Sequence, residues 1–144
     1  GNICRSPLAE LALRQAADAA HLCLIVDSAG TGDWHVGAAP DRRARAEAAR
    51  HGLSIDAYRA RQVTAADFDR FDAIIALDEQ NLVDLRAIAP VGSTAELALL
   101  LDFVPGREGE GVFDPYHGDA AAFAETWADV CAGAAGIVAR YRSA

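Results

Sequence analysis

The sequence contains no hydrophobic run long enough to cross a membrane. No stretch reaches the roughly 18 consecutive apolar residues that a spanning helix needs, and no signal peptide is recognisable. Hydrophobic residues nevertheless make up 52% of the chain, far more than in an intrinsically disordered segment. We therefore expect a folded protein whose partner is not a membrane.

Cysteine is scarce. Cys4, Cys23 and Cys131 are widely spaced, so they do not suggest a disulfide framework. The histidines have no spacing typical of metal ligands. We expect no metal and no cofactor, and a reduced cytoplasmic location is the default for such a chain, with secretion left open.

Lysine is absent, so all 13 basic residues are arginines, and they are outnumbered by 21 acidic residues. The resulting net charge of −8 argues against nucleic acid or an anionic membrane surface as the main partner. An anion-binding site in this protein must therefore be built locally, from arginine and backbone amides.

Predicted helices and strands alternate along the chain. Short apolar runs predict buried strands at residues 22–28 and 73–77, and either a strand or a helix–strand junction at 95–101. Helices are predicted at 7–20, from Asp41 to about His51, at 78–89 and at 119–141, with a helical turn at 64–70. This alternation indicates an α/β fold, a single domain over residues 1–144 with a parallel sheet covered by helices on both faces.

The first seven residues, Gly-Asn-Ile-Cys-Arg-Ser-Pro, read as an anion-binding loop that runs into a helix. Ser6 fits the N-cap position and Pro7 the first helical position. Arg5 offers a planar pair of donors suited to phosphate. Gly1 and Asn2 tolerate a left-handed backbone, which lets successive amides point inward. The predicted phosphate-binding residues are Gly1, Asn2, Ile3, Cys4, Arg5 and Ser6.

Three motifs together resemble the low-molecular-weight protein tyrosine phosphatases. They are G-N-I-C-R-S-P at 1–7, S-A-G-T-G-D-W at 28–34 and D-P-Y at 114–116. The family signature is Cys-x5-Arg-Ser, which implies a nucleophilic cysteine two positions before Gly1. Cys4 has the wrong spacing for that role. The resemblance also implies a strand before Gly1, with the phosphate loop at the first strand–helix junction.

The resemblance implies a role for each matching residue. Arg5 would hold the phosphate and stabilise the transition state, and Asp114 would protonate the leaving phenolate and then activate water. Trp34, Tyr116 and His117 would line the substrate cleft, and Ser28 and Asp78 would support the loop. The implied partners are a phosphotyrosine protein as substrate, and inorganic phosphate or another oxyanion as inhibitor.

Some positions depart from the family pattern. Tyr58 stands where many members have a histidine that supports the loop asparagine, so the support of Asn2 is an open question. His117 replaces a second tyrosine, which could bias substrate choice or add pH dependence. Cys4 is either a redox partner of the nucleophile or a small loop residue.

The predicted function is phosphotyrosine hydrolysis through a cysteinyl-phosphate intermediate. One alternative is an arsenate reductase on the same fold, which would need further cysteines for its redox relay; Cys131 has no paired cysteine in its predicted helix. A second is a non-catalytic phosphate or phosphotyrosine binder, because residues 1–144 do not include the nucleophile. The presence of Asp114, which a pure binder does not need, argues against it.

Overall fold

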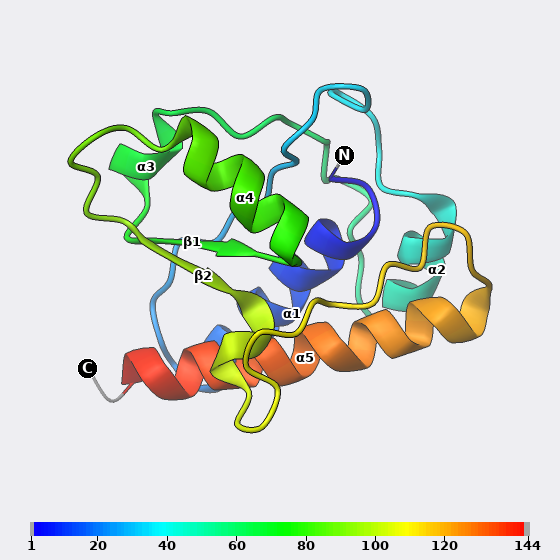
Figure 1. The fold of residues 1–144 in the computed structure, drawn as a ribbon. Coiled ribbons are helices and arrows are strands. Elements are labelled where there is room, and N and C mark those ends of the chain that lie inside the picture. Colours follow the sequence, from blue (N-terminus) through cyan, green and yellow to red (C-terminus); the bar gives the residue numbers. More distant parts are fainter. Residues whose placement is uncertain (1, 143–144) are drawn as a thin grey trace.

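The computed structural model describes residues 2–142. In chain order the helices and strands are α1 (Arg5–Ala19), α2 (Arg42–Arg50), α3 (Asp67–Arg70), β1 (Ala73–Ala76), α4 (Glu79–Ile88), β2 (Glu96–Leu99), the 3-10 turn η1 (Leu100–Phe103) and α5 (Ala120–Arg142). Helices and strands alternate from β1 onward as the sequence predicts, whereas the helices α1, α2 and α3 follow one another with no strand between them in the described residues (Figure 1).

The two strands form a parallel pair. Ala73 lies opposite Glu96 and Ala76 opposite Leu99, with α4 as the connection between the strands. Side chains of a strand alternate between its faces, so Ala76 packs against Leu82 and Leu85 of α4, while Ile75 packs on the other side with α1 and α5. In Figure 1 the strands accordingly lie between α4 and α5. The prediction of a parallel α/β sheet covered on both faces is confirmed.

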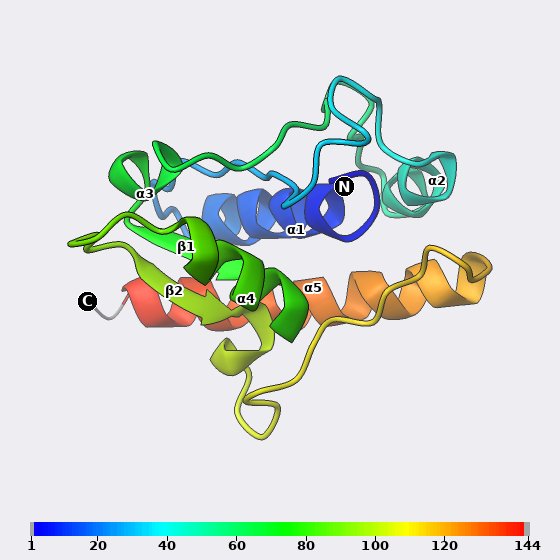
Figure 2. The same ribbon diagram turned by 45° about the horizontal axis from the view of Figure 1, so that its top comes forward.

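The long helices α1 and α5 run side by side and enclose most of the core (Figure 2). Leu8 and Leu11 of α1 are buried against Val130 and Ile137 of α5. Because α1 begins at the predicted phosphate loop, this packing fixes the loop to the body of the protein.

The prediction of a buried strand at 22–28 is wrong as stated. The segment is extended, but no described residue pairs with it in a strand ladder; the nearest bridge joins Gly30 to Gln62. Its residues alternate in burial, with Ile25 91% exposed and Val26 buried. An apolar run predicts an extended, partly buried backbone, but a strand also needs a neighbour to share its hydrogen bonds.

Other boundaries differ by a few residues. The 95–101 segment contains a strand followed by a helical turn, since β2 leads directly into η1. The turn expected at 64–70 becomes helical only at Asp67, whose carboxylate accepts a hydrogen bond from the Thr64 amide at 2.8 Å. Among residues 2–142, no helix is long and apolar enough to cross a membrane.

Candidate active site

Residues 2–4 form a tight loop that leads into α1. Asn2 has a left-handed backbone with φ of 65°, as expected for a loop that turns its amides inward. The helix begins at Arg5 with Cys4 at the N-cap, so the prediction that Ser6 is the N-cap is wrong. The Ser6 hydroxyl instead donates a hydrogen bond to Asn2 Oδ1 at 2.5 Å. Gly1, the first predicted phosphate-binding residue, lies outside the described residues.

A network of hydrogen bonds, which includes the buried Glu10, supports the side chain of Asn2. Asn2 Nδ2 donates to the Ser28 carbonyl at 3.3 Å, and Ser28 Oγ donates to Glu10 Oε1 at 2.7 Å. Glu10 is only 7% exposed and pairs with Arg14 at 2.8 Å. The structure thus supplies support for Asn2 without the histidine that Tyr58 replaces.

Tyr58 lies beside this network. Burial first, and then the Glu10 carboxylate, raises the pKa of Tyr58, while Arg14 opposes the increase. Sequence analysis missed Glu10 and Arg14. The signal was available, because Glu10 is an acidic residue on the apolar face that α1 buries next to Leu11.

Arg5 is held by two distant segments. Its Nη1 forms an ion pair with Asp78 Oδ2 at 2.8 Å and donates to the Val112 carbonyl at 3.1 Å. Asp78 follows β1 and caps α4, accepting a hydrogen bond from the Asn81 amide at 2.8 Å. The guanidinium, 15% exposed, is therefore oriented at the carboxyl end of β1, where ligands of parallel sheets bind.

Cys4 is unsuited to act as a nucleophile at neutral pH. Its side chain is buried, and burial, followed by the charge of Asp41, raises the pKa of its thiol to about 12. The charge of Asp114, which lines the same cavity as Cys4, also contributes to the increase in this pKa. Because only a thiolate is an effective nucleophile, this environment disfavours Cys4 as the nucleophile.

The D-P-Y segment forms a turn. The Tyr116 amide donates to Asp114 Oδ1 at 3.1 Å, and Pro115 is buried while Asp114 is exposed. The rings of His117 and Tyr116 contact each other edge to face, with their centroids 5.0 Å apart. On the 28–37 segment, the ring of Trp34 covers Gly32 so closely that a Cβ there would lie 1.6 Å from it.

One cavity of about 630 Å³ brings these parts together. Residues 2–6, Trp34, Asp114 and Tyr116 line it. Apolar side chains of the 25–30 segment and of β1, together with Leu13 and Ile137, line the same cavity. Neither His117 nor Asp78 is among the described residues that line the cavity. His117 contacts Tyr116, and Asp78 pairs with Arg5.

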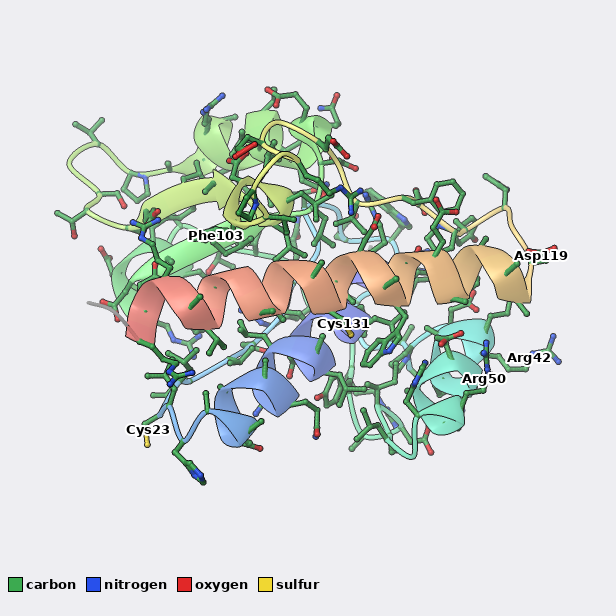
Figure 3. All side chains as sticks on the ribbon, turned by 90° about the horizontal axis from the view of Figure 1, so that it is seen from below. Cys23, Arg42, Arg50, Phe103, Asp119 and Cys131 are labelled. Carbon is green, nitrogen blue, oxygen red and sulfur yellow. The ribbon has the colours of Figure 1, made fainter. Side chains whose placement is uncertain are left out.

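The described residues hold no group of three or more histidine, cysteine, aspartate or glutamate side chains that could bind a metal. Within residues 2–142 the three cysteines are free thiols. Figure 3 shows Cys131 on the side of α5 that faces α1 and α2, and Cys23 beyond the end of α1. Burial, and then Glu47, raises the pKa of Cys131.

Comparison with known proteins agrees with this arrangement. The sequence profile described as "Low molecular weight phosphotyrosine protein phosphatase" matches residues 1–142. A low molecular weight protein-tyrosine-phosphatase of Streptomyces coelicolor is 41% identical over 147 residues, covering 99% of this chain and 89% of that protein.

Solved structures show the same likeness. A protein tyrosine phosphatase from Entamoeba histolytica superposes with a TM-score of 0.93 at 30% identity, covering 99% of this chain and 92% of that one. YfkJ from Bacillus subtilis superposes with a TM-score of 0.90 at 38% identity, covering 99% and 90%. Since the matches in sequence and in structure both span nearly the whole chain, the protein belongs to the low molecular weight phosphotyrosine protein phosphatase family.

Proposed function

We propose that this phosphatase hydrolyses phosphotyrosine in protein substrates through a cysteinyl-phosphate intermediate. The observation that carries the proposal is the shared lining of one cavity. There the loop of residues 2–6 meets an acidic side chain, Asp114, and two exposed aromatic rings, those of Trp34 and Tyr116.

The loop would bind the phosphate group. Amides at the start of α1 are left unpaired by the helix and point toward an anion, and Asn2 turns the backbone inward. Arg5, oriented by Asp78 and Val112, would neutralise the phosphate oxygens as their charge redistributes in the transition state. The phenyl ring would lie between Trp34, which is 69% exposed, and Tyr116.

The nucleophile would be a cysteine two positions before Gly1 in the full-length protein. Cys4 is not an alternative, because its buried thiol stays protonated. The part of the cavity lined by the 25–30 segment and β1 is suited to a strand that leads to this cysteine. Both segments would then gain a partner for their backbone groups.

The reaction would take place in two steps. The thiolate attacks phosphorus, the bond to the phenolic oxygen breaks, and Asp114 gives its proton to the departing phenolate. Asp114 then removes a proton from water, which attacks phosphorus. The S–P bond breaks, releasing inorganic phosphate and restoring the thiolate. Released phosphate would compete with substrate for the same loop.

The test is Asp114→Asn in the full-length protein, assayed on phenyl phosphates whose leaving groups differ in pKa. We expect kcat/KM for phenyl phosphate to fall by roughly 100-fold or more, with a much smaller loss for 4-nitrophenyl phosphate, whose phenolate needs no proton. The control is Asp119→Asn, because Asp119 is an exposed aspartate that follows the D-P-Y segment. An unchanged rate on phenyl phosphate would refute the assignment of Asp114 as the acid.

The same assay separates the alternatives. A non-catalytic binder would retain phosphate affinity in the full-length protein and hydrolyse neither substrate. An arsenate reductase would need mobile, reactive cysteines beside the loop, but Cys131 is half-buried and its pKa is raised by burial.

The free thiol of the exposed Cys23 is compatible with a reducing cytoplasmic location, which we include in the proposal.

A further inference from the structure

We propose that Thr126 on α5, assisted by Asp129, is a positioning residue that holds Asp114 in place for proton transfer. This inference rests on the proposed role of Asp114 as the general acid. Neither α5 residue is among the described residues that line the cavity, and no sequence motif points to them. They act through the backbone of Phe113, the residue that precedes the acid.

Both backbone groups of Phe113 are bound by α5. Thr126 Oγ1 donates to the Phe113 carbonyl at 2.8 Å, and the Phe113 amide donates to Asp129 Oδ2 at 3.4 Å. Thr126 is fully buried and Asp129 is 9% exposed, so water competes little for either hydrogen bond.

These hydrogen bonds set the direction of the Asp114 side chain. The carbonyl of Phe113 and the amide of Asp114 belong to one planar peptide group, so fixing the carbonyl fixes the orientation of the chain as it enters Asp114. The ring of Phe113 is 43% exposed. The segment is therefore held mainly through its backbone, not through packing of the ring.

Neighbouring anchors leave Asp114 between fixed points. On one side the Val112 amide donates to the Leu77 carbonyl at 2.7 Å, and the Val112 carbonyl receives Arg5. On the other side Pro115 is buried. The 112–115 segment is thus attached to the phosphate-binding arginine and to α5 at consecutive residues.

Thr126 uses its hydroxyl in an unusual way for a helical threonine. Within a helix, threonine commonly donates to a carbonyl of the preceding turn. Here it reaches a residue 13 positions away instead. Asp129 is in turn oriented by Arg107, whose Nη1 lies 2.8 Å from Asp129 Oδ1. Both side chains therefore point at the acid segment because of tertiary contacts.

The test compares Thr126→Val, which removes the hydroxyl at nearly constant shape, with Thr126→Ser, which retains it, in the full-length protein. We expect Thr126→Val to lower kcat/KM for phenyl phosphate about tenfold, since a misplaced acid donates its proton poorly. The loss on 4-nitrophenyl phosphate and the change in inhibition by inorganic phosphate should both be small. Thr126→Ser should restore the activity on phenyl phosphate.

Other results overturn the inference. An unchanged dependence on the leaving group in Thr126→Val, an equal loss on both substrates, or a Thr126→Ser variant as impaired as Thr126→Val would each assign Thr126 a role in packing alone. Should Thr126→Val not fold, Asp129→Ala gives the same test: a steeper dependence supports the inference and an unchanged one refutes it.

Asp114→Asn, measured in parallel, distinguishes a failure of the positioning role of Thr126 from a failure of the acid role of Asp114. If Asp114→Asn alters the leaving-group dependence and Thr126→Val does not, only the positioning role is wrong. If Asp114→Asn leaves it unaltered, the proposed acid is wrong, and the positioning role is refuted together with it.

Discussion

At the scale of single residues, Arg5 joins three parts of the chain that are far apart in sequence. It starts α1, pairs with Asp78 before α4, and donates to Val112 beside Asp114. The sequence predicts a phosphate ligand here because an arginine stands at the start of a helix. It could not predict the Val112 contact, which spans 107 positions, since that contact depends on how the helices pack.

Arg5→Lys tests this geometry. Lysine keeps the charge but not the planar fork, so it cannot hold Asp78, Val112 and a phosphate oxygen together. We expect phosphate affinity, measured by isothermal titration calorimetry, to fall roughly tenfold to 100-fold, the range for losing a charged hydrogen bond. Arg140→Lys, whose ion pair with Glu96 lies at the far end of α5, should bind phosphate as the wild type does. Unaltered affinity in Arg5→Lys would contradict a two-pronged role.

At the scale of elements, local sequence signals predicted the helices to within a few residues. They also predicted the strands near 73–77 and 95–101, but the strand predicted at 22–28 is not one. The helices predicted to start at Asp41 and Asp78 do start there, with these two residues as N-caps, because a capping side chain and the amide it binds are close in sequence. The 22–28 run failed as a strand because pairing depends on a neighbour that local pattern does not reveal. The Gly52 backbone, with φ of 73°, ends α2 as glycine at that position predicts.

Asp41 connects an element to the site, because its amide donates to the Ile3 carbonyl while its carboxylate accepts from the Arg43 amide at 2.8 Å. We expect Asp41→Ala to lower the free energy of unfolding by about 1 kcal/mol, the usual value of an N-cap. Asp41→Asn retains the cap and should lose less. Urea unfolding at neutral pH measures both.

The effect of Asp41 should depend on pH. The hydrogen bond from the Arg43 side chain lowers the pKa of Asp41 below its usual 3.8. Since the folded state favours the ionised carboxylate, the stabilisation is present above that usual pKa and is lost as the pH falls through the lowered value. The difference between wild type and Asp41→Asn should therefore shrink in acid. A difference that stays constant would show that the charge contributes nothing.

At the scale of the whole molecule, α5 is the element on which the other parts assemble. It packs along α1, contacts η1, and donates a hydrogen bond from Thr126 to the backbone of Phe113. Close approach of η1 requires a small residue, because a Cβ at Gly136 would lie 2.1 Å from the Phe103 carbonyl oxygen. A backbone atom cannot move aside as a flexible side chain can.

Gly136→Ala should consequently destabilise the protein, although alanine favours a helix by about 1 kcal/mol over glycine. The clash with the Phe103 backbone forces η1 away from α5, and thermal unfolding should show a Tm several degrees lower, on the order of 5 °C. The control is Ala135→Gly at the exposed neighbouring position, which changes helix propensity alone. A higher Tm in Gly136→Ala would mean that η1 tolerates the shift at no cost.

The sequence by itself determined the features that are local. These include the helix caps at Asp41 and Asp78, the start of α1 close to Arg5, and the strands near 73–77 and 95–101. Each can be predicted because the groups involved are neighbours in the chain, or because a periodic pattern reports which face is buried.

Tertiary structure decided which of these features meet. It placed Asp114 and Trp34 in the lining of one cavity, oriented Arg5 with Asp78 and Val112, and supported Asn2 through Ser28 and Glu10. It also brought Thr126 to the peptide before Asp114. The physical reason is the same throughout: these contacts join side chains and backbone groups from distant segments, and only the packing of α1 and α5 around the sheet brings such groups within hydrogen-bond distance.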